Sequence, residues 1–174
     1  MRYVIVSVVK GDAGNFNNNM RKDVYEKFKA KSSKLPAHFT IKSPFEYNDI
    51  SELEETLNKF SKDNEKAPYI IKGYNHFDNR VIYMDVIMSS QGKKLHDKLI
   101  DSLSNIHYVD ISERDGKDKI FHITISSKKI QKIYDELWNY VNKFPCNYNC
   151  YFDNISIYKW QDNTWILHRE YLLK

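Results

Sequence analysis

The sequence predicts an α+β fold built from two similar lobes that pack about a pseudo-twofold axis. Two observations support this. The order strand, helix, hairpin occurs twice along the 174 residues. The two runs also share one offset of 84 residues, which relates His38 to His122 and the turn residue Asp78 to Asp162. Neither unit has enough elements to bury its sheet and helix alone, so both should pack into one domain spanning 1–174.

The composition fits a single soluble domain. Hydrophobic residues make up 41% and charged residues 29%, which supplies both a core and a solvated surface. No apolar run approaches the roughly 20 residues that span a bilayer, and the N-terminal segment is too short and too β-branched for a secretory signal. We therefore expect a cytoplasmic monomer that makes no membrane contact. Cys146 and Cys150 are too few for a disulfide framework.

The first elements are read from apolar patterning and turn residues. The β-branched run at 2–9 predicts a buried strand. The Gly- and Asn-rich segment 11–19 predicts a loop, and a helix should follow over about 20–32. The apolar stripe of that helix is Val24, Tyr25 and Phe28. Pro36 and Pro44 then bracket a short strand around 38–41.

The rest of the first half is a helix and a hairpin. Asp49 or Ser51 caps the helix, and its acidic start suits the helix dipole. Apolar residues recur in it at helical spacing: Ile50, Leu53, Leu57 and Phe60. The hairpin is expected as strands at about 69–74 and 80–88, with a turn at 75–79.

The second half repeats this order. A helix carrying apolar residues at helical spacing leads into a charged loop, 113–119. Those apolar residues are Leu95, Leu99, Leu103 and Ile106. A strand at 120–126 and a helix over about 130–141 follow, and the helix stops before Pro145. The last elements are strands at about 150–159 and 164–172, which turn at 161–163.

This order divides the chain between the lobes. Lobe one should include about 1–88 in part, and lobe two about 120–172. The N-terminal segment and residues 89–119 should cross between them.

Basic residues are concentrated between positions 21 and 34. They are Arg21, Lys22, Lys27, Lys29, Lys31 and Lys34, against only Asp23 and Glu26 in that stretch. A solvated helix face and a patch for nucleic acid both fit this run, and the net charge of +4 permits a polyanionic partner without requiring one.

Two His-x-Thr-Ile motifs, at 38–41 and 122–125, carry the candidate chemistry. Alternate side chains of a strand share a face, so the apolar residues should enter the core while each imidazole and hydroxyl face away from it, about 7 Å apart. The residues expected on the two polar faces are His38, Thr40 and Lys42, and His122, Thr124 and Ser126. Pseudo-symmetry would bring these two faces together across one cleft.

Such a set suits the cleavage of a phosphodiester. One neutral imidazole removes a proton from the attacking oxygen while a protonated one donates to the leaving oxygen, and the unperturbed pKa of histidine, about 6.5, suits both roles. Threonine hydroxyls can donate to non-bridging phosphate oxygens and stabilise their developing charge.

The paired motifs, their spacing and the repeated lobes resemble the 2H (two-histidine) phosphoesterase superfamily. Within it, the similarity is to the bacterial 2′-5′ RNA ligase and RNA 2′,3′-cyclic phosphodiesterase family. The run from Pro36 to Phe45 adds to this, because the family often follows its first motif with a Pro-Phe segment. The resemblance implies a concave antiparallel sheet in each lobe, helices on the outer faces and an active cleft between the lobes.

The resemblance also implies the activity and its residues. It implies metal-independent chemistry without a cofactor, on RNA or a nucleotide with a 2′,3′-cyclic phosphate or a 2′-5′ linkage. By motif position, His38 and His122 take the catalytic roles and Thr40 and Thr124 bind phosphate. Two further residues are possible substrate contacts, Lys42 and Ser126, the latter standing where the family sometimes has a basic residue.

Two other interpretations remain open at this point. The motif histidines could ligate zinc together with another histidine, and the candidates are His76, His96, His107 and His168. Alternatively, the chain could be an RNA- or nucleotide-binding module that keeps the cleft without turnover, with some of its abundant aromatic residues stacking on bases. The sequence does not decide between hydrolase and ligase, or which histidine is the base.

Overall fold

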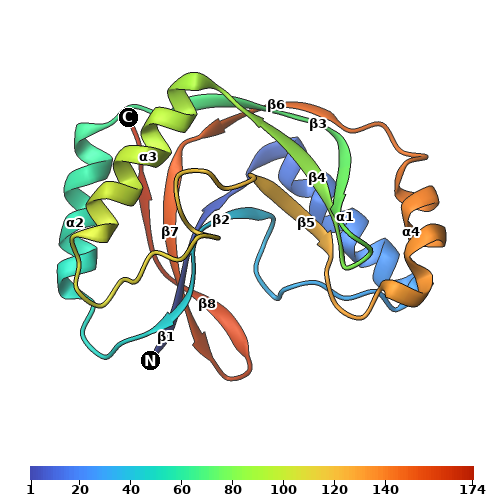
Figure 1. The fold of residues 1–174 in the computed structure, drawn as a ribbon, viewed down its shortest axis with the longest axis horizontal. Coiled ribbons are helices and arrows are strands. Elements are labelled where there is room, and N and C mark those ends of the chain that lie inside the picture. Colours follow the sequence, from blue (N-terminus) through green and yellow to red (C-terminus); the bar gives the residue numbers. More distant parts are fainter.

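A computed structural model describes residues 1–174 as two four-stranded antiparallel sheets and four α-helices (Figure 1). The first sheet has the order β2 (His38–Glu46), β1 (Arg2–Val8), β7 (Asn154–Gln161) and β8 (Thr164–Leu172). The second has the order β5 (His122–Ser126), β4 (Val81–Met88), β3 (Ala67–Phe77) and β6 (Asn147–Phe152). This arrangement confirms the α+β fold with pseudo-twofold symmetry, in which the strand carrying each motif is the edge strand of its sheet.

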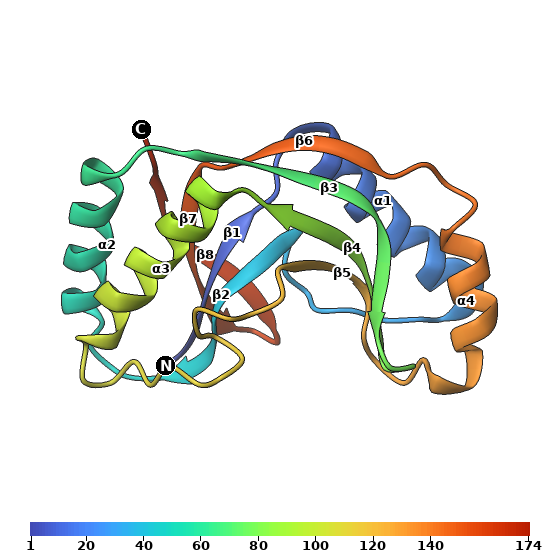
Figure 2. The same cartoon turned by 45° about the horizontal axis from the view of Figure 1, so that its top comes forward.

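The helices lie at the two ends of the molecule. They are α1 (Gly11–Phe28), α2 (Ser51–Asp63), α3 (Ser90–Ser104) and α4 (Tyr134–Val141). Figures 1 and 2 show α2 and α3 at one end and α1 and α4 at the other, with the strands between them. A 3₁₀ turn, Gln131–Ile133, precedes α4, so the helix expected from residue 130 starts later than its apolar spacing indicated. None of the four helices is both long and apolar enough to cross a membrane.

The sheets exchange hairpins between the two repeats of the sequence. The hairpin β3–β4 belongs to the sheet of β5, and the hairpin β7–β8 belongs to the sheet of β2. The expected lobes, one with about 1–88 in part and the other with about 120–172, therefore do not coincide with the two sheets. The 84-residue offset still relates equivalent turns, since Asp78 and Asp162 both adopt left-handed backbone angles, with φ of 48° and 49°. A repeat shows which elements correspond, whereas sheet membership depends on long-range pairing that a repeat does not encode.

The segment 11–19 is helical, which the sequence did not predict. Its glycines and asparagines have low helix propensity, but tertiary packing overrides that preference. One face of α1 is buried: Ala13, Gly14, Asn17, Met20 and Val24. Gly14 is required there, because a Cβ atom at this position would lie 2.1 Å from the carbonyl oxygen of Val9. The helix ends at Phe28, earlier than expected, where Lys29 takes a left-handed conformation.

The single strand expected at 150–159 is two strands in different sheets. β6 ends at Phe152, and after Asp153 the chain enters β7 of the other sheet. The side chain of Asn154 holds this crossing in place, since its amide bonds to both the N–H and the carbonyl oxygen of Val8. The signal of the break in the sequence is Asp153-Asn154, two residues that are disfavoured within strands.

One hydrophobic core joins the two sheets. A single cluster of 38 buried residues includes side chains from all eight strands, so the lobes do not have separate cores. Phe39 lies at its centre and packs edge to face on Phe121, with ring centroids 5.5 Å apart. Phe39 directly follows His38, and Phe121 directly precedes His122. Their contact in the core therefore helps to fix the distance between the two motif strands.

Candidate active site

The two motif strands lie next to each other where the edges of the sheets meet. β2 and β5 are in direct contact although no backbone ladder joins them, and Figures 1 and 2 both draw them side by side at the centre of the molecule. Within the two motifs the predicted alternation is confirmed: Phe39, Ile41, Ile123 and Ile125 are fully buried. His38, Thr40, His122 and Thr124 are only partly buried, on the opposite faces of their strands.

Both imidazoles are held in the same way. His38 Nδ1 lies 2.6 Å from the carbonyl oxygen of Pro36, and His122 Nδ1 lies 2.8 Å from that of Ile120. A carbonyl only accepts, so each Nδ1 carries the proton and each Nε2 is left to take up or release one. Each histidine is thus oriented by the carbonyl two residues before it, and the two motifs are equivalent in geometry as well as in sequence.

The surroundings make both histidines hard to protonate. Burial, helped by the positive charges of Arg21 and Lys119, lowers the pKa of His38 to about 4, and the hydrogen bond to Pro36 opposes this shift. Burial also lowers the pKa of His122, again with Lys119 acting in the same direction. A positive charge on His122 also acts to lower the pKa of His38.

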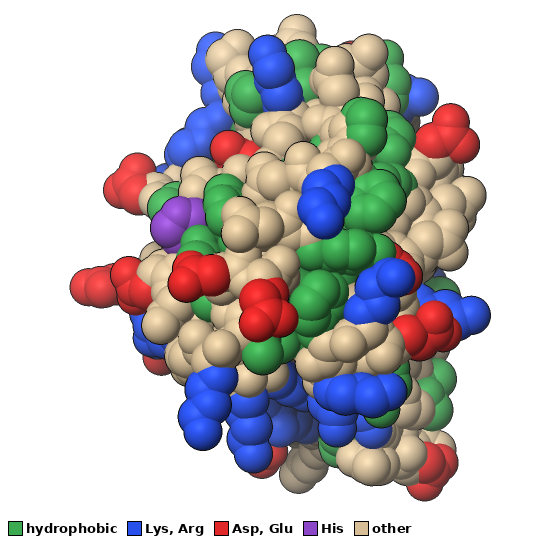
Figure 3. Space-filling view, turned by 90° about the vertical axis from the view of Figure 1, so that its right-hand side faces the viewer, with side chains coloured by type: hydrophobic (Ala, Val, Ile, Leu, Met, Phe, Trp, Pro, Cys, Tyr) green, Lys and Arg blue, Asp and Glu red, His purple; other side chains and the backbone are tan.

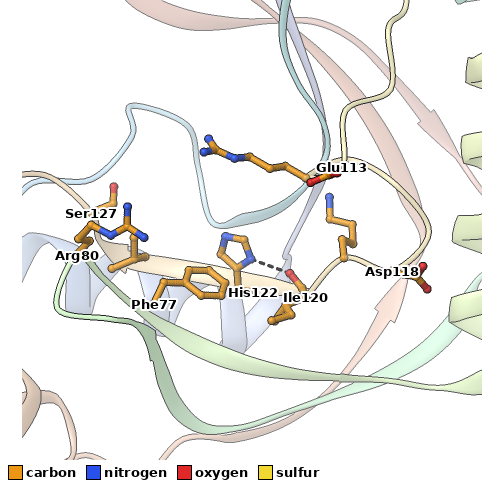
Figure 4. A pocket seen from close by; sticks show the side chains of 10 residues that line it. Phe77, Arg80, Glu113, Asp118, Ile120, His122 and Ser127 are labelled. Atoms are coloured by element: carbon orange, nitrogen blue, oxygen red, sulfur yellow. Dashed lines mark hydrogen bonds between the residues drawn. The ribbon is translucent and has the colours of Figure 1, made fainter.

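A cavity of about 640 Å³ opens beside His122 (Figure 4). The ring of Phe77 stands edge to face against the imidazole, with centroids 5.0 Å apart. Arg80 and Ser127 lie at one end of the cavity, and Asp118 lies at the other. The cations around it are Arg80, Arg114 and Lys119, against the acidic Glu113 and Asp118. The cavity therefore presents a proton-transfer group beside several positive charges, a combination suited to an anion.

The sequence of this chain matches one family along most of its length. The profile of the 2′-5′ RNA ligase superfamily matches residues 13–164. The chain belongs to this superfamily. A relative from Geobacillus sp. (strain WCH70), named "putative phosphoesterase", is 21% identical over 178 residues, which cover 99% of this chain and 96% of the relative.

Solved structures of other proteins show the same fold. TT0787 of Thermus thermophilus matches with a TM-score of 0.63 at 12% identity, and LigT of E. coli, solved with 3′-AMP, matches with 0.62 at 12%. Both alignments cover 99% of this chain and 98% of the other. At such identities these likenesses concern the fold, and they agree with the paired sheets described above.

Lys119 is a site residue that sequence reasoning passed over as part of a charged loop. Its ammonium group donates to the carbonyl oxygen of Thr40, so the segment leading into β5 is tied directly to the first motif. Burial lowers the pKa of Lys119 to about 8. Its position three residues before His122 could have marked Lys119 as a site residue. No feature of the surrounding sequence, however, indicated that this loop folds back onto β2.

Lys42 does not face an open cleft, as the strand alternation suggested. It is 4% exposed and its ammonium group lies 3.0 Å from the carboxylate of Asp115. Asp115 also accepts from the backbone N–H and hydroxyl of Ser43 and from the hydroxyl of Ser112. Burial by itself would raise the pKa of Asp115, but the hydrogen bonds from Ser43, Lys42 and Ser112 hold it below its usual value. This buried pair anchors the loop that carries Arg114 and Lys119, so Lys42 is not available to a substrate.

Ser126 is likewise internal. It is fully buried, and its hydroxyl donates to the carbonyl oxygen of Lys31. The next residue, Ser127, lines the cavity instead. The expected substrate contact at 126 is therefore replaced by a structural bond that ties the end of β5 to the segment before β2.

The asparagines of α1 also hold the motif strands. The amide of Asn17 donates to the carbonyl oxygen of Thr124, and the side-chain oxygen of Asn18 accepts from the N–H of Ala37. Adjacent residues of one helix thus contact both motif segments. The Asn-rich run predicted as a loop is a positioning element for the site.

The histidines considered for a zinc site are scattered. His76 packs on Trp138, His96 lies buried against Phe121, and His168 pairs with Glu54. No three His, Cys, Asp or Glu side chains come together as a metal-binding group. The structure does not bring the donor set of that alternative together.

Proposed function

We propose that this superfamily member is a metal-independent phosphoesterase for RNA-type phosphodiesters. Its substrates would carry a 2′,3′-cyclic phosphate or a 2′-5′ linkage. The observation that carries the proposal is the matched orientation of the two imidazoles, each bonded through Nδ1 to a carbonyl, on two adjacent edge strands. Two such groups on either side of one phosphorus supply the base and the acid that phosphodiester cleavage needs.

For a cyclic phosphate the step is a hydrolysis. The oxygen of a water molecule forms a bond to phosphorus while one histidine takes the proton of that water through Nε2. The bond from phosphorus to one ribose oxygen breaks, and the other histidine, protonated at Nε2, donates its proton to that oxygen. Thr40 and Thr124, which share the strand faces of the histidines, would donate hydrogen bonds to the non-bridging oxygens as charge develops.

The electrostatics of the cavity fit an anionic substrate. The charges of Arg80, Arg114 and Lys119 favour a phosphate. A bound anion would also raise the histidine pKa values that burial lowers, so one imidazole can be protonated in the complex. LigT, which shares the fold, has been solved with 3′-AMP, with phosphate and with ATP. Both histidines come from one chain, so a monomer suffices.

The test is an activity panel of 2′,3′-cyclic nucleotides, 2′-5′-linked oligonucleotides and tRNA halves, each run with and without EDTA. We expect turnover of at least one class, unchanged by EDTA. Loss of activity on chelation, restored by stoichiometric zinc, would contradict the metal-independent mechanism. Tight binding of these compounds without turnover would instead identify a binding module that keeps the same cleft.

A further inference from the structure

We propose that a second, basic groove beside the motif strands binds the backbone of a single-stranded RNA that extends from the scissile phosphate. This inference rests on the proposed function and deepens it, because it makes an oligonucleotide, rather than a mononucleotide, the preferred substrate. The groove is a separate hollow of about 470 Å³ between α1 and the segment before β2.

The groove is lined by cations and by no acidic residue. Five of its eleven lining residues are basic: Arg21, Lys22, Lys31, Lys34 and Lys128. Figure 3 looks onto the end of the molecule formed by α1 and α4, and shows Lys and Arg side chains gathered along its lower edge. Lys22 has an acidic neighbour, at 3.9 Å from Glu26, but the other lysines have none in ion-pair range. An uncompensated row of ammonium groups attracts a polyanion.

Arg21 contributes to the shape of the groove, because its guanidinium is already hydrogen-bonded within the protein. Its guanidinium donates to the hydroxyl of Ser32 and to the carbonyl oxygens of Ser33 and Leu35, which fixes the curve of residues 32–35. Lys31 and Lys34 project from this fixed segment and are exposed. Lys31 and Lys34 are therefore held at one side of the groove by a segment with a fixed conformation.

The chain segments that line the groove lead directly into both motif segments. At one end, Leu35 is followed by Pro36, whose carbonyl holds His38. At the other end, the carbonyl of Lys31 accepts from the N–H groups of Ser127 and Lys128. Ser127 lines the cavity of His122 while Lys128 lines the groove. A strand whose phosphate lies between the histidines can therefore pass directly over Lys31 into the groove.

Tyr25 favours a single strand over an isolated phosphate. Its ring is 46% exposed and lines the groove, with the ammonium groups of Lys29 and Lys31 at 5.6 and 6.0 Å from its centroid. An exposed aromatic ring among lysines is the arrangement with which proteins stack an unpaired base beside a bound backbone.

The test uses the full chain and the triple variant K31Q/K34Q/K128Q. A matched control, K59Q/K62Q/K98Q, removes three exposed lysines from α2 and α3 at the other end of the molecule. Fluorescence anisotropy measures binding of a labelled RNA of about ten nucleotides that ends in a 3′-phosphate and cannot be turned over. We expect the groove variant to bind at least about tenfold more weakly, and its salt slope to fall by about 2, since each single-strand phosphate contact contributes about 0.7. The control should bind like the parent.

A second pair of variants tests the stacking. Tyr25→Leu should weaken binding of the same RNA on the order of tenfold. Tyr151→Leu is its control, because Tyr151 is also exposed and also has a lysine, Lys66, over its ring. A duplex of the same sequence should be insensitive to Tyr25→Leu.

Binding and turnover separate this inference from the proposed function. If the RNA binds through the groove lysines but no phosphodiester is cleaved, the groove stands and the catalytic proposal fails. If a cyclic mononucleotide is turned over but the groove and control variants bind RNA equally well, the groove is wrong and the catalytic proposal stands. If both triple variants weaken RNA binding equally, the loss comes from the lower net charge of the protein and not from the groove. This result would also overturn the groove proposal.

Discussion

The two motif strands carry the same residues in different surroundings. In both, a carbonyl two residues earlier orients the imidazole. His122 looks onto an open cavity and packs on the rings of Phe77 and Tyr83. His38 instead follows the segment that Arg21 holds through the carbonyl oxygen of Leu35, and burial, together with the charge of Arg21, lowers the pKa of His38 to about 4. Local sequence thus sets the orientation of each histidine, whereas the neighbouring elements set how readily it holds a proton.

This difference assigns unequal roles to equivalent residues. His38 is the histidine whose protonated form is disfavoured by the larger number of positive neighbours, so we expect it to act as the base in hydrolysis. We then expect His122, beside the open cavity, to act as the acid that protonates the leaving oxygen.

Removing either histidine should remove most of the activity. His38→Ala and His122→Ala should each lower kcat by about 10²–10⁴-fold, the usual contribution of one proton transfer. The double variant should lose much less than the product of the two, because the residues act as a unit. Steady-state turnover of a 2′,3′-cyclic nucleotide measures this, with the exposed His107→Ala as the control. Near-full activity in both single variants would refute acid–base catalysis by this pair.

Breaking the buried ion pair should mainly cost stability. Asp115→Asn leaves the ammonium group of Lys42 buried without its counter-ion, which typically costs about 3–5 kcal/mol of unfolding free energy. Urea unfolding at neutral pH measures this. Because the folded pKa of Asp115 is lowered, its contribution is present above the unfolded value of about 3.9 and is lost as the pH falls through the folded value. The difference in unfolding free energy between the parent and Asp115→Asn should therefore become smaller at acid pH.

A second variant separates the charge from the packing at this pair. Adding Lys42→Met to Asp115→Asn removes the uncompensated charge, so part of the lost stability should return. Identical unfolding midpoints for parent and Asp115→Asn would show that the pair does not anchor the loop.

Replacing a motif threonine should slow turnover without disturbing the fold. Thr40→Val and Thr124→Val keep the β-branched shape that suits a strand but remove the hydroxyl. The loss should be about 10²–10³-fold in kcat, as for one oxyanion donor. Comparing the two values shows whether the phosphate lies nearer to one motif. Unchanged kcat in both variants would remove the threonines from the mechanism.

The smallest effect concerns pH. Plotted against pH, kcat/KM should be bell-shaped, with its maximum on the acid side of the ordinary histidine pKa, since both imidazole pKa values are lowered. The charge of Lys119 lowers both, so Lys119→Met should raise them and move both limbs of the profile to higher pH. Lys117→Met, in which an exposed lysine paired with Asp101 is removed, should leave the limbs in place. A profile unmoved by Lys119→Met would contradict the electrostatic coupling.

Local pattern determined the parts of the site that depend only on strand geometry. The alternation of apolar and polar residues correctly placed Phe39 and Ile123 in the core and the histidines on the opposite faces of their strands, because side chains of any strand alternate. The 84-residue offset correctly identified equivalent turns, since the Asp and Asn residues there tolerate left-handed backbone angles.

Only the tertiary structure decided what each element meets. The exchange of hairpins between the sheets follows from hydrogen-bonded pairing between residues far apart in the chain. The helical start of α1 follows from burial of its Ala13 and Asn17 face, which outweighs a poor intrinsic propensity. The same holds for Lys42, which strand parity placed at the cleft but which pairs with Asp115, 73 residues away in sequence. The sequence analysis gave Lys119 no role beyond its charged loop, yet its ammonium group donates to Thr40, 79 residues away. Periodicity is a property of neighbouring residues, whereas burial and ion pairing depend on the whole folded chain.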